Sequence, residues 1–100
     1  MQQTLPLEPY AGRPYFLAIR GDPDLESPDE FGVTVYYNDA ESEERVAVAR
    51  IDTDHGYVHL DKLFLEDNPK EELDVDLWGA VEHLTEHHPE YARKYRQKKR

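Results

Sequence analysis

The sequence predicts an α+β fold: a four-stranded antiparallel β-meander with a C-terminal helix packed on one face and a short terminal helix. In the first two thirds of the chain, β-branched and aromatic residues alternate with polar ones, which is typical of strands. In the last third, apolar residues recur at three- and four-residue steps, which is typical of an amphipathic helix. A chain of 100 residues has room for one domain, so we expect residues 1–100 to fold as a single unit.

Four strands are expected within a sheet that spans residues 15–65. They are residues 15–20, 31–37, 45–52 and 57–65. Short segments rich in acids, Gly or Pro separate them, which favours antiparallel neighbours. Strict alternation would place Val46, Val48, Arg50 and Asp52 on one face of their strand. Residues 1–14 carry three prolines and no periodicity, and we expect an extended lead-in there.

A helical segment is expected over residues 69–97. Asn68–Pro69 offers a cap followed by a proline at the first helical position, and Asp74 or Asp76 are alternative caps. A proline disfavours helical geometry at the residue before it. Pro89 therefore predicts a break, followed by a second, short helix.

The charge of the chain is acidic and unevenly distributed. Acids outnumber Lys and Arg by 22 to 12, which gives a formal charge of −10. We expect either a solvated, salt-adapted surface or a docking surface for a basic partner. Residues 91–100 form a basic tail that holds six cations: Arg93, Lys94, Arg96, Lys98, Lys99 and Arg100. Such a tail can contact nucleic-acid phosphates, fold back on the acidic body or extend into solvent.

Several classes of protein are excluded by composition. No apolar run approaches the roughly 20 residues that span a bilayer, so we expect no membrane partner. The first residues lack the features of a signal peptide, which predicts a soluble, cytoplasmic protein. The absence of cysteine excludes disulfide scaffolds, Cys-based zinc sites and thiol catalysis.

The densest group of chemically capable side chains lies around the third turn. Its members are Arg50, Asp52, Asp54, His55, His59 and Asp61. If the strands on either side pair, Asp52 lies nearly opposite Tyr57 and the polar faces coincide. A histidine beside a carboxylate suits acid–base catalysis, and two carboxylates with a histidine can hold a divalent metal. An arginine nearby would bind phosphate. The alternative is a set of cross-strand ion pairs without a function.

The stretch from Arg50 to His59 resembles the R-x-D-x-x-H-G-x-x-H signature of small prokaryotic proteins related to the TumE-type toxins of toxin–antitoxin modules. The resemblance implies a compact α+β protein, with Arg50, Asp52, His55 and His59 at the matching positions. We expect a toxin-like protein that cleaves RNA phosphodiesters. Its catalytic residues would be Asp52, His55 and His59, and its substrate-binding residues Arg50, Asp54 and Asp61, with the basic tail adding attraction for RNA.

No organic cofactor is expected, and a divalent metal of unknown identity is possible. The partners implied are RNA and an antitoxin or other protein. The alternative function is a non-catalytic interaction module that binds a basic protein, or that forms a homodimer through a sheet edge.

A second motif lies on the expected helix. His83, Glu86 and His87 spell H-x-x-E-H, the inverted zinc-protease motif. Only thirteen residues follow His87, which leaves little chain for a third ligand. We expect a polar helix end there instead of a zinc site.

Overall fold

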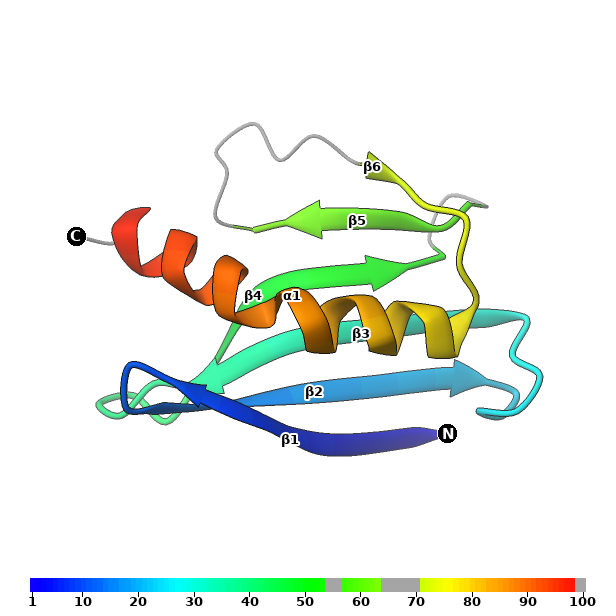
Figure 1. Ribbon diagram of the computed structural model, residues 1–100. Coiled ribbons are helices and arrows are strands. Elements are labelled where there is room, and N and C mark those ends of the chain that lie inside the picture. Colours follow the sequence, from blue (N-terminus) through cyan, green and yellow to red (C-terminus); the bar gives the residue numbers. More distant parts are fainter. Residues whose placement is uncertain (54–56, 64–70, 99–100) are drawn as a thin grey trace.

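The computed structural model describes residues 1–53, 57–63 and 71–98. It shows a six-stranded antiparallel sheet, with strands adjacent in chain order, and one C-terminal helix (Figure 1). The strands are β1 (Gln2–Tyr10), β2 (Arg13–Asp22), β3 (Glu30–Asn38), β4 (Arg45–Asp52), β5 (His59–Lys62) and β6 (Glu71–Glu72). The helix is α1 (Leu77–Lys98). The α+β prediction is confirmed, whereas the predictions of four strands and of a second helix are wrong.

The predicted extended lead-in is the edge strand β1. Leu5 and Leu7 pair with Leu17 and Tyr15 of β2 and pack against the core. Proline lacks a backbone N–H, but an edge strand tolerates it because one side of its backbone needs no partner. The prolines of residues 1–14 are therefore compatible with a strand, although they made it hard to predict from the sequence.

The other unpredicted strand is β6, which lies inside the segment predicted to be helical. It pairs with β5, which is shorter than the predicted 57–65. The predicted helix start at Asn68–Pro69 lies outside the described residues.

Helix α1 begins at an aspartate cap. The N–H of Gly79 donates to Asp76 Oδ1 (2.8 Å), and the N–H of Ala80 donates to the Asp76 carbonyl (2.9 Å). Satisfying these terminal N–H groups is what an N-cap does. Asp76 is thus the cap among the alternatives that the sequence offered.

The predicted break at Pro89 does not occur, and α1 runs through this residue. Pro89 cannot donate to the carbonyl of Thr85 four residues earlier. His88 compensates, because its Nδ1 donates to that same carbonyl at 2.9 Å. The other ring nitrogen, Nε2, lies 2.9 Å from the carbonyl oxygen of Glu8 and so links the helix to β1.

A β-bulge in β4 changes which side chains reach the core. Val35 lies opposite Ala49, but the next residue of β3, Tyr36, lies opposite Ala47, so Val48 is an extra residue. Val48 and Ala49 are both fully buried. The prediction that Val46, Val48, Arg50 and Asp52 share one face is therefore wrong, because the bulge separates the two valines from Arg50 and Asp52.

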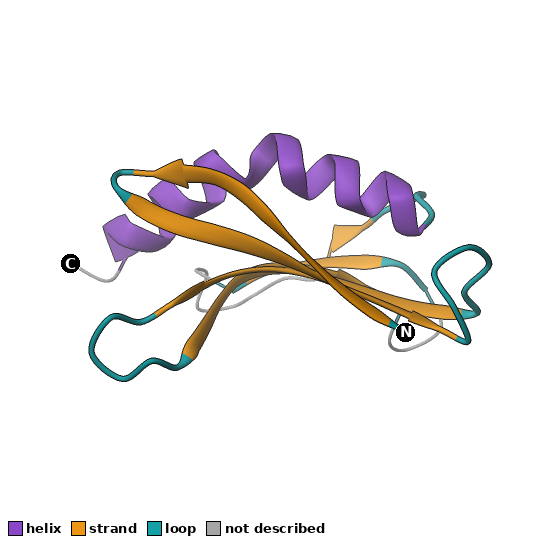
Figure 2. Cartoon of the chain, turned by 90° about the horizontal axis from the view of Figure 1, so that it is seen from below, coloured by secondary structure: helices purple, strands orange, loops and turns teal. Residues whose placement is uncertain are grey.

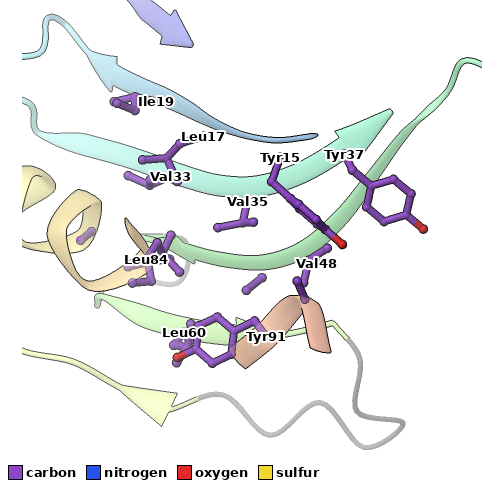
Figure 3. Close-up of a cluster of buried hydrophobic side chains, with 14 of the residues drawn as sticks. Tyr15, Leu17, Ile19, Val33, Val35, Tyr37, Val48, Leu60, Leu84 and Tyr91 are labelled. Carbon is purple, nitrogen blue, oxygen red and sulfur yellow. The ribbon is translucent and has the colours of Figure 1, made fainter. Parts of the chain in front are cut away.

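The sheet has two unlike faces. Helix α1 lies along one face of the sheet, called here the covered face (Figure 2). Apolar side chains from β2 to β5 form a core with residues of α1 on this face (Figure 3). Its central members are Leu17, Val33, Val35, Ile51 and Leu60. Among the described residues no helix or strand lies over the opposite face, called here the open face (Figure 2). In this part of the chain, no helix has the length and apolar character needed to cross a membrane.

Candidate functional site

The open face brings polar residues of β4 and β5 into register. Arg50 pairs with Asp61, and Asp52 pairs with His59. The prediction that Asp52 lies opposite Tyr57 is wrong by two residues. Since side chains alternate with a period of two, a shift by two leaves the same side chains on the same face. Four of the six predicted site residues therefore meet at one place.

The four side chains form an ion-pair network. His59 Nε2 lies 2.9 Å from Asp52 Oδ1 and 3.6 Å from Asp61 Oδ2. Arg50 Nε lies 3.1 Å from Asp52 Oδ2, and an Arg50 terminal nitrogen lies 3.6 Å from Asp61 Oδ2. The other ring nitrogen of His59, Nδ1, donates to the carbonyl of Tyr57 at 3.3 Å. The two carboxylates thus hold both the imidazole and the guanidinium.

Burial divides this network into an inner and an outer part. Asp52, His59 and Asp61 are only 4 %, 1 % and 1 % exposed. The Arg50 side chain is 43 % exposed. Arg50 is therefore the group that solvent or a ligand reaches first, and the buried aspartates fix where its guanidinium stands.

A hollow of about 310 Å³ lies beside Arg50 on the open face. Its lining is mainly polar and includes Gln2, Thr4, Arg20, Gly32, Thr34, Arg45, Arg50 and Asp52. Gly32 makes room for one of the arginines, because a Cβ at this position would lie 2.9 Å from a terminal nitrogen of Arg20. Three guanidiniums against one carboxylate make this hollow cationic in a chain that is acidic overall.

Aromatic rings extend the open face beyond the hollow. Phe16 stacks on Tyr36 with ring centroids 5.5 Å apart. The guanidinium of Arg45 lies 4.3 Å from the centre of the Tyr36 ring. This cation–π contact positions Arg45 at the border of the hollow.

The remaining predicted site residues are not part of this arrangement. Asp54, His55, Lys99 and Arg100 lie outside the described residues. The other four tail cations, Arg93, Lys94, Arg96 and Lys98, lie on the last turns of α1. Because α1 packs on the covered face, these cations do not join Arg50 on the open face.

Two tyrosines lie on α1 among the cations of the basic tail, and both are core residues. Tyr91 and Tyr95 are buried, and Tyr95 makes an edge-to-face contact with Tyr37 at 6.1 Å. Their four-residue spacing therefore serves helix packing.

The histidines of the H-x-x-E-H motif stack on each other. The rings of His83 and His87 are 4.3 Å apart and nearly parallel. His87 Nδ1 donates to the His83 carbonyl at 2.9 Å, and His83 Nε2 lies 3.1 Å from the Tyr91 hydroxyl. Burial, followed by the nearby His87, lowers the pKa of His83. In the part of the chain that the structure describes, the group placed to share a metal ion is Asp52, His59 and Asp61, and these two histidines are not in it.

Sequence reasoning missed Arg20, Gly32, Thr34 and Arg45 as neighbours of Arg50. They come from three different strands, and the register of those strands brings them together. The signal available was that Arg20 ends one predicted strand and Arg45 begins another. Arg45 lies five residues before Arg50, so strict alternation would place the two on opposite faces, and the bulge at Val48 places them on the same face.

Comparison with known proteins places the chain in a family. Residues 3–100 match the model of a domain of unknown function, DUF7718. The chain belongs to this family. No curated protein and no solved structure matches this DUF7718 chain. Nothing in these comparisons connects it to TumE-type toxins, so the resemblance around Arg50–His59 remains a local one.

Proposed function

We propose that this DUF7718 protein binds a short segment of RNA through its phosphates on the open face of the sheet. The observation that carries the proposal is the convergence of Arg20, Arg45 and Arg50 on one hollow. Guanidinium groups present several N–H donors in a planar fork that fits phosphate oxygens.

Arg50 is the central residue of this proposal. Two of its nitrogens face Asp52 and Asp61, so its position is fixed before a ligand arrives. A guanidinium has five N–H donors, and the remaining ones are available on a side chain that is partly exposed. Preorganisation of this kind lowers the entropy lost on binding.

The charges around the hollow limit the length of RNA that fits. Acidic residues fill the β2–β3 and β3–β4 connections, at the two ends of the sheet (Figure 1). A polyanion that ran past the hollow would meet these carboxylates. The proposed footprint is therefore a few nucleotides.

Cleavage of the bound phosphodiester is a second candidate, and the contact between Asp52 and His59 favours it. A histidine oriented by a carboxylate can transfer protons near neutral pH. Asp52 lines the hollow, but His59 is 1 % exposed, so cleavage requires His59 to gain access to the ligand. Cleavage of RNA is also the function that the resemblance to TumE-type toxins implies.

The interaction-module alternative has one feature in its favour and one against it. The acidic connections suit a basic protein partner. Pairing of a second copy along β1 is opposed by Pro6 and Pro9, which lack N–H donors in this edge strand.

The proposal is tested by fluorescence anisotropy with a labelled six-nucleotide RNA at low salt. Arg20→Gln and Arg45→Gln are each expected to weaken binding about tenfold, since a hydrogen bond to a charged group contributes about 1.5–3 kcal/mol. Arg93→Gln on α1 is the matched control and should bind as the wild type does. Equal losses in all three variants, or no binding by the wild type, would overturn the proposal.

The cleavage candidate is tested in the same mixtures. RNA fragments on a gel, together with growth arrest on expression, are expected if the protein is a toxin-like nuclease. Both effects should then disappear in His59→Gln. Binding without fragments at any salt concentration would leave RNA binding and remove cleavage.

A further inference from the structure

We propose that Asp52, His59 and Asp61 bind a divalent transition-metal ion, with Zn²⁺ preferred. We call these three residues the Asp–His–Asp cluster. The proposal does not rest on RNA binding, because it concerns the buried inner part of the network rather than the arginines.

The first argument is the spacing of the ligand atoms. One nitrogen or oxygen from each residue of the cluster lies within 4.8 Å of the other two. His59 Nε2 is 2.9 Å from Asp52 Oδ1 and 3.6 Å from Asp61 Oδ2. Metal–ligand distances of 2.0–2.2 Å in a tetrahedral site place neighbouring ligand atoms about 3.4 Å apart. The two separations, 2.9 and 3.6 Å, lie on either side of that value.

The second argument is the orientation of the imidazole. His59 Nδ1 lies 3.3 Å from the Tyr57 carbonyl oxygen and donates to it, which turns Nε2 toward the two carboxylates. Histidine ligands of metals usually have this backbone support on the other nitrogen. Nε2 is thus held beside one oxygen of each carboxylate, and a metal ion bound there would contact all three atoms.

The third argument is charge. Two carboxylates are buried in the cluster, and the guanidinium of Arg50 contacts both of them. Buried carboxylates are costly unless they are paired or coordinate a metal. Arg50 Nε contacts Oδ2 of Asp52, whereas His59 contacts Oδ1, so the arginine and an ion can use different oxygens of the same carboxylate.

The ligand types indicate which ion fits. An imidazole with two carboxylates is a mixed nitrogen–oxygen set, which suits Zn²⁺ and, more weakly, Mn²⁺. Mg²⁺ and Ca²⁺ prefer all-oxygen sites. Asp52 lines the hollow on the open face, which gives an ion a route to the cluster.

Isothermal titration of the EDTA-treated full chain with ZnCl₂ tests the proposal. We expect one Zn²⁺ per chain, weaker Mn²⁺ binding and no Mg²⁺ binding. His59→Gln and Asp61→Asn should each weaken Zn²⁺ binding by at least about tenfold. His83→Gln and His87→Gln are the matched controls on α1, and they should leave the affinity unchanged.

X-ray absorption at the zinc edge of the loaded wild-type protein keeps the test decisive if the cluster variants do not fold. One imidazole and two carboxylate ligands are expected. Two or more imidazoles, or loss of binding in the α1 variants instead of His59→Gln, would assign the ion to the helix histidines and overturn the proposal. The absence of saturable binding at one equivalent would also overturn it. These titrations contain no RNA, so their failure leaves the RNA proposal standing.

Discussion

The two faces of the sheet are built by the same strands and serve opposite purposes. On the covered face, Val33, Ile51 and Leu60 are buried against α1. On the open face, the neighbouring positions are Gly32, Asp52 and His59, which form a buried row with two ionisable side chains. Burial of apolar surface is the main favourable term in folding, whereas burial of charge costs free energy that ion pairing only partly returns. The covered face therefore accounts for the stability of the fold, whereas the buried ionisable side chains of the open face are not explained by stability.

We propose that the polar residues of the open face serve a function. Replacing buried ion pairs by apolar residues is often neutral or stabilising, so the Asp–His–Asp cluster is not the most stable choice for its position. Proteins break the rules of core design mainly at functional sites. The contrast between the faces can be tested by changing one face at a time.

The largest expected effect is on the covered face. Leu84 of α1 is fully buried, and Leu84→Ala should lower the free energy of unfolding by about 2–5 kcal/mol, because it leaves a cavity. Thr34→Ala on the open face should change it by no more than about 0.5 kcal/mol. Urea denaturation of both variants measures the difference. Similar losses would contradict the division of roles between the faces.

The second-largest expected effect on stability comes from the Asp–His–Asp cluster, where removing one residue is compared with removing all three. His59→Leu removes a group that contacts both buried carboxylates, and should cost about 3 kcal/mol. Replacing Asp52, His59 and Asp61 together by leucines should restore most of that stability. If the single variant is as stable as the wild type, the buried carboxylates do not depend on His59 for their stabilisation.

The cap of the helix gives a smaller effect. Asp76→Ala removes the acceptor for the Gly79 N–H and should lower stability by about 1 kcal/mol. Asp74→Ala is the matched control, since Asp74 lies two residues before the cap and is exposed. Equal thermal shifts in the two variants would show that α1 does not depend on this cap.

The smallest effect is the pH dependence at His83. Its pKa is lowered in the folded state, first by burial and then by the charge of His87. A group whose folded pKa is depressed favours folding when deprotonated, so this contribution is present above the ordinary value of 6.5 and is lost as the pH falls below it. Tyr91, Glu71, Glu86 and Lys62 also interact with this ring. His83→Gln should flatten the fall in stability between pH 6.5 and 5, measured by urea denaturation.

The elements that the sequence predicts well are those whose pattern is set by local alternation. The strand predicted at 31–37 corresponds to β3, and the one at 45–52 to β4, because their alternation follows from burial on one face. The predictions from sequence failed where the structure compensates for the N–H group that a proline lacks. The Pro89 break is prevented by a hydrogen bond from His88, and the prolines of β1 are accommodated at a sheet edge.

The candidate site was predictable in part for the same reason. Arg50, Asp52, His59 and Asp61 lie close in sequence, so pairing of two adjacent strands was enough to suggest their meeting. Arg20 and Gly32 join them through two further strand pairings. The bulge at Val48 brings Arg45 to the same face of β4 as Arg50. No local pattern in the sequence predicts this bulge.

The salt dependence of RNA binding tests the role of the open face most directly. Each phosphate neutralised on a single strand contributes about −0.7 to the slope of log K against log salt. Three arginines therefore predict a slope of about −2 for the wild type, about −1.4 for Arg20→Gln and an unchanged slope for Arg93→Gln. A slope that is the same in the wild type and in Arg20→Gln, or that falls in Arg93→Gln instead, would contradict phosphate binding at the hollow.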